Sequence, residues 1–539
     1  MRHNPWFVRG RALGFMLPLS LACACAASDD EGDGALSNAE EGGGSSGDGG
    51  SGLSTSAGTL TGGQGESGGD ETGGAGDDGQ PEPPDPPPDD TGVEESSTGE
   101  PACEDTVPTV LYLSPDDSNS MSSPVQARDA VLGGWSSVSA VPIRVWEFLN
   151  YYSFAYPAAE AGTVLVTPSL VHDAGDPDGE YLLQIAVSSE SSGIGVRPAI
   201  NLVLVLDTSG SMEGLAMDML KESCRTMAAN LRAGDTISLV TWNTDNQVVL
   251  EGHTAVGPND ATVLAAIDAL AASGGTDLNG GLVAGYALAN EVYQSERINR
   301  LVLISDGGAN VGVTDIELIA EQANKSGADG IYLVGVGVGE ATDYNDQLMD
   351  EVTDAGKGAS VFVGSAAEAQ KVFGERFVST LSVAVRNVQV ELELPPGFQI
   401  VKFSGEEYSG DPAEIEPQHL APDDAMVFHQ RISTCAPAVV TDETPIIVTA
   451  RFQLPLTGAV AEVAVETTFG ELLAADDPLL RKGAAVFGYA EALKAWQGAS
   501  QQDERDALVA DALAELAVAE AALPGDAELA EIRSVLEAM

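Results

Sequence analysis

The sequence predicts an α/β fold, with a doubly wound, mostly parallel sheet, a flanking β-sandwich and helices at the C-terminus. From about residue 199, short apolar runs alternate with amphipathic helical stretches. Beyond residue 381 the apolar residues recur at every second position, and after residue 475 they return to a helical spacing. Apolar strands that alternate with helices are typical of a parallel sheet covered on both faces, whereas period-two alternation is typical of antiparallel strands.

The α/β region is expected to span residues 198–382. Its strands are predicted from the apolar runs at 202–206, 237–240, 248–250, 301–304, 331–338 and 361–363. Its helices are predicted near 214–231, 260–272, 278–294, 315–326, 343–355 and 366–381. Thr314, followed three residues later by Glu317, forms a capping box at the start of the fourth helix.

Two regions that flank the α/β region are expected to be β-structure. In 383–472 the residues 388–394 alternate between apolar and polar, and in 103–197 the residues 183–187 do the same. Such strands are expected to have one solvated face. We expect both regions to form one sandwich into which the α/β region is inserted. The helices predicted in 473–539 are expected to pack on their own protein.

The N-terminus has the features of an export signal. Three arginines within the first eleven residues precede a short apolar run, 12–22. Such a run is too short to remain as a membrane-spanning helix. A cysteine at the cleavage point resembles the bacterial lipobox, in which the thiol is acylated, so Cys23 or Cys25 is the predicted lipidation site. The alternative is ordinary cleavage after Ala24 or Ala26, which gives a secreted or periplasmic protein.

An acidic linker, residues 26–102, is expected to follow the signal and lipobox segment, residues 1–25. It consists largely of Gly, Ser, Asp, Glu and Pro, and residues 28–100 carry 19 acidic side chains and no Lys or Arg. This composition cannot bury a core and predicts disorder. A flexible chain of about 75 residues spans on the order of 50 Å, so the linker is expected to hold the folded part away from a membrane surface.

Three cysteines lie beyond the signal. Cys224 falls within a helical apolar pattern and is expected to be a buried thiol. In an oxidising compartment Cys103 and Cys435 can form a disulfide that ties the beginning of the folded part to its late β region. The sequence also leaves open that these two cysteines do not pair.

The charge of the chain excludes several classes of partner. The 539 residues include 83 Asp and Glu against 24 Lys and Arg, a formal net charge of −59, of which −43 falls in residues 101–539. Such a chain is repelled by phosphate backbones and anionic lipids, which argues against nucleic acid and against a polybasic membrane surface. Divalent cations and basic partners stay compatible with this charge.

Three polar loops carry residues that suit a metal ion. Asp-Thr-Ser-Gly-Ser (207–211) follows the first strand, Ser-Gly-Gly-Thr-Asp (273–277) opens a helix, and Ser-Asp-Gly (305–307) ends the fourth strand. Ligands of open α/β sheets collect beyond the carboxyl ends of the strands, at a topological switch point. Carboxylates and hydroxyls are hard oxygen ligands, unlike the Cys and His of zinc sites. They favour Mg²⁺, with Mn²⁺ or Ca²⁺ as alternatives, and leave one position for an acidic ligand.

The three loops together resemble the von Willebrand factor type A domain and its metal-ion-dependent adhesion site. This resemblance implies a Rossmann-like fold. It also implies that the serines and the threonine of the site bind the metal directly and that the aspartates bind it through water. The metal positions that it implies are Asp207, Ser209, Ser211, Thr276 and Asp306.

A wider resemblance, over about residues 140–500, is to bacterial lipoproteins of the YfbK-like group. It depends on the segments 144–157, 310–315, 343–349 and 356–358. The function of that group is poorly characterised, so this resemblance informs the fold more than the function.

These observations lead us to expect an exported, lipid-anchored protein of the bacterial cell envelope, at the outer membrane or cell surface. Its expected function is to bind an extracytoplasmic protein whose exposed acidic residue completes the coordination of Mg²⁺. One alternative is a structural envelope protein with an incidental or structural metal. Another is a periplasmic metal-dependent hydrolase, which is disfavoured because the sequence contains no nucleophile elbow, no His-Glu-x-x-His and no phosphate-binding loop. We therefore expect a binding protein and not an enzyme.

Overall fold

The computed structural model describes residues 106–115, 120–134, 141–173, 179–307, 316–323, 330–341, 344, 346–455 and 457–539. The signal, the acidic linker, Cys103 and the segment 310–315, which contains Thr314 of the predicted capping box, lie outside these ranges. The proposed Cys103–Cys435 disulfide therefore stays a prediction. Cys224 is fully buried with a free thiol, as expected. Within the described ranges, no helix has the length and apolar character that a membrane crossing requires.

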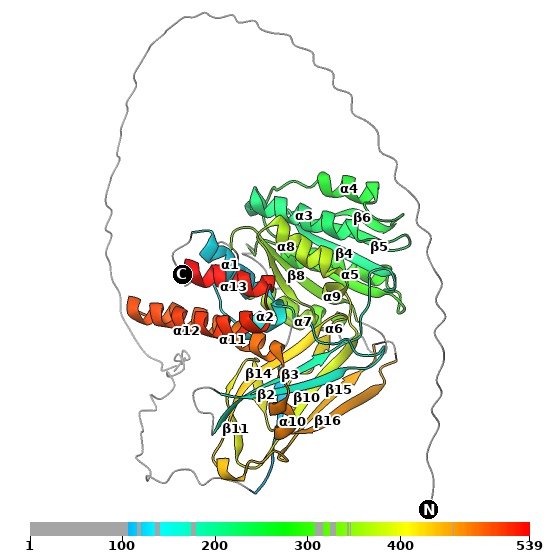
Figure 1. Cartoon of the computed structure of the whole chain (residues 1–539). Coiled ribbons are helices and arrows are strands. Elements are labelled where there is room, and N and C mark those ends of the chain that lie inside the picture. Colours follow the sequence, from blue (N-terminus) through cyan, green and yellow to red (C-terminus); the bar gives the residue numbers. More distant parts are fainter. Residues whose placement is uncertain are drawn as a thin grey trace, which may run out of the picture. The chain divides into compact units, whose positions relative to one another are not determined.

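A six-stranded sheet forms the centre of the α/β region, in the order β6-β5-β4-β7-β8-β9 (Figure 1). Neighbouring strands are parallel except for β6, which runs antiparallel to β5 at one edge. The prediction of a mostly parallel sheet is confirmed. The strands are β4 (Ile200–Asp207), β5 (Thr236–Trp242), β6 (Gln247–Thr254), β7 (Ile298–Ser305), β8 (Tyr332–Val338) and β9 (Ser360–Val363).

Helices cover both faces of this sheet. Successive strand residues point to opposite faces, so a strand of continuous apolar residues has two apolar faces to bury. In β4, Val203 and Val205 contribute to one core, whereas Leu204 and Leu206 contribute to the other. The first face is covered by α5 (Leu278–Glu291), α6 (Ile316–Ala323) and α7 (Asp346–Gly356). The second is covered by α3 (Leu215–Ala229), α4 (Ala261–Asp268), α8 (Ala366–Gln370) and α9 (Phe377–Leu381). The region is therefore doubly wound, as predicted.

Several helices of this region differ from their predicted lengths; the one predicted at 278–294, for example, ends at Glu291. The predicted helix at 260–272 ends at Asp268. The predicted helix at 366–381 is divided, because a π-helical turn at Lys371–Glu375 separates α8 from α9. Gly374 lies within this turn, and glycine is a poor helix former.

Two antiparallel sheets pack face to face and form the β-sandwich. One has the order β12-β1-β10-β15-β16, with β13 paired to β10, and the other has the order β11-β14-β3-β2. The strands that precede the α/β region are β1 (Thr109–Ser114), β2 (Leu165–His172) and β3 (Glu180–Ser188). Those that follow it are β10 (Val385–Leu394), β11 (Phe398–Phe403), β12 (Glu407–Ser409), β13 (Gln418–Leu420), β14 (Ala425–Thr434), β15 (Pro445–Gln453) and β16 (Val460–Thr468). Because β1 pairs with β10 and β3 pairs with β14, the α/β region is inserted into one sandwich, as expected.

The expectation that β3 has a solvated face is wrong. Gln184, Ala186 and Ser188, which the alternation placed on that face, are all buried. The helix α11 (Pro478–Gly498) covers Gln184, whose Nε2 donates to the Leu479 carbonyl at 3.0 Å, and the Ser188 hydroxyl donates to the Pro157 carbonyl at 2.7 Å. Gly483 permits this approach, since a Cβ atom there would lie 1.8 Å from Gln184 Oε1. The polar residues of β3 are thus hydrogen-bonded inside the protein and not to solvent.

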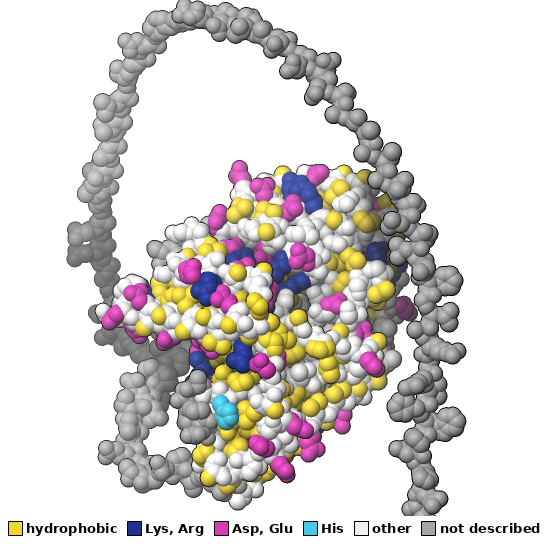
Figure 2. All heavy atoms as spheres, in the orientation of Figure 1, with side chains coloured by type: hydrophobic (Ala, Val, Ile, Leu, Met, Phe, Trp, Pro, Cys, Tyr) yellow, Lys and Arg dark blue, Asp and Glu magenta, His cyan; other side chains and the backbone are white. Residues whose placement is uncertain are grey.

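The C-terminal helices pack on the rest of the chain, as expected. They are α10 (Phe469–Ala474), α11, α12 (Gln502–Ala522) and α13 (Ala527–Ala538). Helix α11 contacts β3, β14 and α2 (Val145–Tyr151), and α13 contacts α1 (Ser122–Leu132). Figure 2 shows acidic side chains spread over the visible face of the molecule, with fewer Lys and Arg side chains among them.

Helices α1 and α2 were not among the sequence predictions, and their buried contacts are partly polar. The Ser122 hydroxyl of α1 donates to Asp346 of α7 at 2.8 Å, and the Ser123 backbone donates to Glu147 of α2 at 2.5 Å. Arg144 forms ion pairs with both of these carboxylates. Burial raises the pKa of Glu147, which is fully enclosed. This network joins the segments 144–157 and 343–349, on which the YfbK-like resemblance depends.

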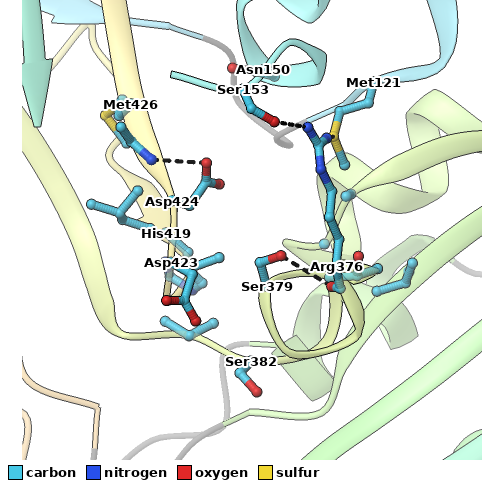
Figure 3. A pocket seen from close by; sticks show the side chains of 18 of the residues that line it. Met121, Asn150, Ser153, Arg376, Ser379, Ser382, His419, Asp423, Asp424 and Met426 are labelled. Carbon is cyan, nitrogen blue, oxygen red and sulfur yellow. Dashed lines mark hydrogen bonds between the residues drawn. The ribbon is translucent and has the colours of Figure 1, made fainter. Parts of the chain in front are cut away.

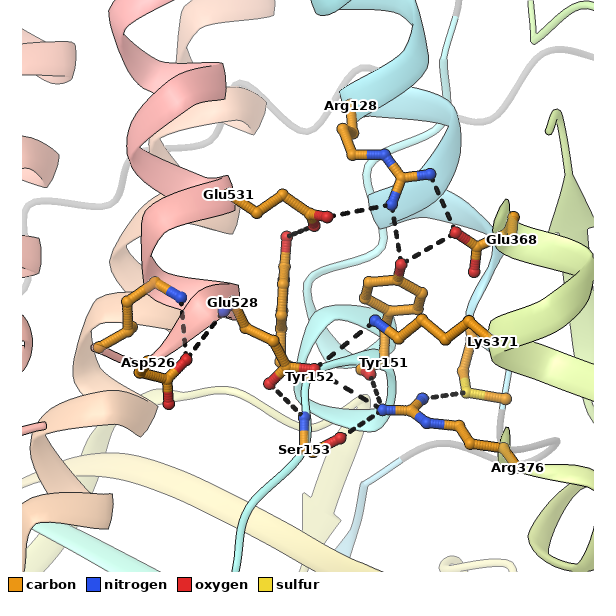
Figure 4. Close-up of polar contacts among 12 residues, drawn as sticks. Arg128, Tyr151, Tyr152, Ser153, Glu368, Lys371, Arg376, Asp526, Glu528 and Glu531 are labelled. Carbon is orange, nitrogen blue, oxygen red and sulfur yellow. Dashed lines mark hydrogen bonds and ion pairs between the residues drawn. The ribbon is translucent and has the colours of Figure 1, made fainter. Parts of the chain in front are cut away.

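A second polar network attaches the last helices of the α/β region to the flanking helices (Figure 4). Arg128 of α1 contacts Glu368 of α8 at 3.0 Å and the Tyr151 hydroxyl of α2 at 2.8 Å. Lys371 lies 3.5 Å from Glu528 of α13. Charged and polar contacts therefore join α1 and α2 to α8, and the π-helical turn after α8 to α13.

The inserted arrangement predicts that the segment 383–472 does not fold alone. In isolation β10 and β14 lose their partners β1 and β3, so the sandwich core is left open to water. We expect the isolated segment to show poor NMR amide dispersion and no cooperative thermal unfolding. The segment 103–539, which keeps both sets of strands, is the control and should unfold cooperatively. A well-dispersed spectrum of the short segment would contradict the insertion.

Candidate metal centre

The candidate site lies where the strand order of the parallel sheet reverses. The chain continues from β4 to β5 on one side and later returns as β7 on the other side of β4. Asp207 is the last residue of β4, and Ser305, followed by Asp306, is the last residue of β7. Since β4 and β7 are parallel neighbours, both carboxyl ends meet at one edge of the sheet. Such a switch point is the usual ligand position in open α/β sheets.

The Asp207 carboxylate is buried and held by two donors. Its Oδ1 accepts from the Ser209 backbone N–H at 2.8 Å, and its Oδ2 accepts from the Ser305 hydroxyl at 2.6 Å. Burial raises the pKa of Asp207 to about 6, although the hydrogen bonds from Ser305 and Ser209 lower it, and the charge of Asp306 raises it further. A cation next to Asp207 would favour its charged form.

Two serine hydroxyls lie beside this carboxylate at a spacing that suits a metal. The Oγ atoms of Ser209 and Ser211 are 3.1 Å apart. Adjacent ligands of an octahedral Mg²⁺, each at about 2.0–2.1 Å, are separated by about 2.9 Å. Ser209 is buried and Ser211 is exposed, so the pair extends from the interior to the surface. The two hydroxyls therefore fit neighbouring positions around one hard cation.

Backbone contacts bring the loop of Thr276 to the same edge. The Ser273 N–H donates to the Thr208 carbonyl at 2.7 Å, and the Gly210 N–H donates to the Gly274 carbonyl at 3.2 Å. Gly274 has a positive φ of 82°, which glycine adopts without strain. Thr276 itself is half-buried. The structure thus brings the loops of all the predicted metal residues together, while their binding of a metal stays a prediction.

The sequence prediction assigned no role to two residues that hold these loops, Ser305 and Thr244. The Ser305 hydroxyl donates to Asp207 and accepts from the Gly307 N–H at 3.1 Å. The Thr244 hydroxyl, in the turn after β5, accepts from the Gly275 N–H at 2.7 Å. Ser305 could have been found by its position directly before Asp306, and Thr244 by its place in a polar turn that follows a buried strand.

The hydroxyl oxygens of the site are suitable ligands for Mg²⁺. In the part of the chain that the structure describes, no group of three or more His, Cys, Asp or Glu side chains is placed to hold a metal. A metal at this edge would therefore depend on hydroxyls beside two carboxylates, which suits a hard cation. The residues that would hold it are Asp207, Ser209, Ser211, Thr276 and Asp306.

Comparisons with known proteins agree with this fold. The sequence model of the von Willebrand factor type A domain matches residues 201–375. The uncharacterized protein YfbK of Escherichia coli (strain K12) is 31% identical over 264 residues, which are 48% of this chain and 45% of YfbK. The uncharacterized protein sll0103 of Synechocystis is 27% identical over 224 residues, 42% of this chain and 52% of that protein. The chain thus spans about half the length of these relatives.

A solved structure is also similar. The von Willebrand factor type A protein from Catenulispora acidiphila is 14% identical, with a TM-score of 0.44. The similarity covers 68% of this chain and 89% of that chain.

Substitution of Ser305 by alanine tests how Asp207 is positioned. Removal of the 2.6 Å hydrogen bond leaves one oxygen of the buried carboxylate without its donor. We expect Ser305→Ala to weaken Mg²⁺ or Mn²⁺ binding about tenfold or more, as measured by isothermal titration calorimetry. Ser273→Ala is the control, because Ser273 is exposed and reaches the site through its backbone. Equal affinities of the two variants would refute the role of Ser305.

Proposed function

This chain is a von Willebrand factor type A domain protein, similar to the YfbK-like group, and from that premise we propose that it binds a protein partner through a metal-dependent adhesion site. The partner would provide an exposed Asp or Glu side chain. Domains of this family commonly mediate contacts between proteins. The observation that carries the proposal is the 3.1 Å spacing of the Ser209 and Ser211 hydroxyls beside the buried Asp207 carboxylate.

The residues of the site have three different roles in this proposal. Ser209, Ser211 and Thr276 would offer hydroxyl oxygens directly, and Asp207 and Asp306 would bind through water. Ser305 holds the Asp207 carboxylate in one orientation. When bound, Mg²⁺ would supply an open coordination position and a positive charge for the partner's carboxylate.

The charge around the site makes a cation necessary for capture of an acidic partner. Glu213, Asp245 and Asp277 are exposed in or next to the loops of the site. None of the loop segments 207–214, 242–247, 273–280 and 305–307 contains a Lys or Arg. Without a cation, a carboxylate of the partner would be repelled by these acidic side chains. We therefore expect partner binding to require the metal.

Capture of envelope proteins with and without the metal tests this function. Because Asp207 is at the centre of the site, Asp207→Ala should abolish capture of the partner in Mg²⁺ without loss of the fold. The wild-type chain should capture its partner in Mg²⁺ and release it in EDTA, as measured by pull-down from an envelope fraction. Glu251→Ala removes the same charge from the exposed strand β6 and should bind like the wild type. Capture that survives both EDTA and Asp207→Ala would instead favour a structural role.

We further propose that the mature chain is held at the bacterial envelope by a lipid on Cys23 or Cys25. The support for this is the basic N-terminus, the short apolar run and the acidic linker, all of which are features of the sequence. The linker would then separate the binding domain from the membrane. The membrane contact of the chain would be through this anchor.

Removal of the two thiols tests the anchor. The double substitution Cys23→Ser and Cys25→Ser should abolish incorporation of a labelled fatty acid and move the chain from the membrane fraction to the soluble fraction. Each single substitution identifies the acylated residue, since the other cysteine serves as its matched control. Membrane association of the double variant would contradict lipid anchoring.

A further inference from the structure

Strand β16 forms one margin of the β-sandwich (Figure 1). It is hydrogen-bonded to β15 over Val460–Thr468 and, among the described residues, to no other strand. In an antiparallel pair every second residue turns its N–H and C=O groups away from its partner. The free side of β16 therefore presents a row of backbone donors and acceptors along a strand of nine residues.

The other strand edges in the described part of the chain have features that hinder such pairing. Strands β12, β13 and β9 have only three or four residues each. Strand β2 contains Pro168, which has no N–H group to donate. Register shifts interrupt the pairing of β11 with β14 and of β6 with β5. Short strands, proline and irregular register are features by which natural sheets prevent contacts between their edges.

Strand β16 has none of these features. It pairs with β15 at nine consecutive positions without a shift of register, and it contains no proline, lysine or arginine. Five of its nine residues are Val or Thr, which are enriched in strands. The free edge of β16 is therefore a regular template for one more antiparallel strand.

The two faces of β16 determine which side chains an added strand would need. Val463 and Val465 pack at the margin of the sandwich core. The alternate residues face solvent, and among these Glu462 and Glu466 carry negative charge. Side chains directly opposite one another on paired strands lie on the same face. An added strand would therefore place apolar side chains beside the two valines and its other side chains beside the two glutamates.

The charge of the two glutamates is only partly compensated within the described residues. The neighbour of Glu466 in β15 is Ile447, which carries no charge. The Glu462 side chain is 65% exposed and lies 3.5 Å from Arg451, which makes a shorter contact of 2.7 Å with Glu391. Exposed ion pairs of this kind are weak. Both glutamates thus remain available to a basic side chain of a partner.

Other parts of the same protein are poor occupants of this edge. Residues 101–539 carry a net charge of −43, so a second copy of the chain would be repelled. The acidic linker would be repelled as well, because residues 28–100 contain 19 acidic side chains and no Lys or Arg. A basic segment, in contrast, is attracted by the charge of the whole chain and by the two glutamates at the edge.

We propose that the free edge of β16 binds an extended basic segment of a partner protein as an added antiparallel strand. Glu462 and Glu466 are four residues apart, on the order of 13 Å along a strand. The segment therefore carries Lys or Arg at two positions four residues apart, and the first and third of the residues between them are apolar. Backbone hydrogen bonds supply affinity in this mode of recognition, and the side chains supply selectivity.

Binding of a synthetic peptide to the mature chain tests this edge. The probe is the acetylated and amidated peptide Thr-Lys-Val-Thr-Val-Lys-Thr, and its binding is measured by calorimetry at low salt in EDTA. EDTA excludes the metal centre, and Asp207→Ala should bind the peptide like the wild type. We expect the peptide Thr-Glu-Val-Thr-Val-Glu-Thr to bind at least tenfold more weakly. No binding of the lysine peptide at millimolar concentration, or equal binding of both peptides, would overturn the proposal.

Backbone measurements show whether the peptide is added as a strand. Alternate N–H groups of Val460–Thr468 should exchange with solvent rapidly in the free chain and slowly in the complex, whereas Gln247–Thr254 of β6 should not change. N-methylation of one set of alternate peptide amides should abolish binding, and N-methylation of the other set should not. Equal binding of both methylated peptides would refute strand addition. Slow exchange of β16 in the free chain that increases with protein concentration would show a second copy at the edge and would also overturn the proposal.

A pair of double substitutions locates the binding. Glu462→Gln with Glu466→Gln removes both charges from an exposed face and keeps the size of the side chains, so the fold should be retained. We expect this variant to bind the lysine peptide about fivefold more weakly or less, because two exposed ion pairs are lost. Glu251→Gln with Glu504→Gln removes the same charge from exposed positions of β6 and α12 and should bind like the wild type. Equal affinities of the two double variants would refute a contact at β16.

Discussion

The antiparallel pairing of β3 with β14 is the contact on which the arrangement of the described chain depends. It joins Glu180–Ser188 to Ala425–Thr434 without a shift of register, although the whole α/β region lies between these strands in the sequence. Since β3 ends just before the α/β region and β10 begins just after it, both chain crossings connect the sandwich to the α/β region. The α/β region is therefore attached at both of its ends, and the candidate metal centre lies at the edge of the sheet away from them.

The fold could be predicted where the buried residues are apolar. The strands of the parallel sheet are covered on both faces, and continuous apolar runs such as that of β4 follow from this. Buried polar residues follow no such sequence pattern. Gln184 of β3 was predicted to face solvent, yet it is hydrogen-bonded to Leu479 under α11. Helix α1 was missed for a related reason, because Ser122 and Gln126 on its buried side bind Asp346.

The candidate site could be predicted in part for the same physical reason. Asp207, Ser209 and Ser211 are close in sequence, so one short motif places them together. Ser305 reaches Asp207 only because β4 and β7 are parallel neighbours, which depends on the tertiary structure. The pocket lined by Arg300, Arg376 and Asp424 (Figure 3) was beyond prediction, since its walls come from segments that are far apart in the sequence.

If the chain is tethered at its N-terminus, as proposed above, the pairing of β1 with β10 has a mechanical consequence. If a partner held at the metal centre is pulled away from the membrane, the load passes from the N-terminus through β1 to β10 and from there into the α/β region. Thr109 of β1 is paired with Leu394 of β10, so the two strands are pulled from opposite ends. The force then acts in shear on all five paired positions together, and does not open them one after another. This geometry resists extension in the direction in which a surface tether is loaded.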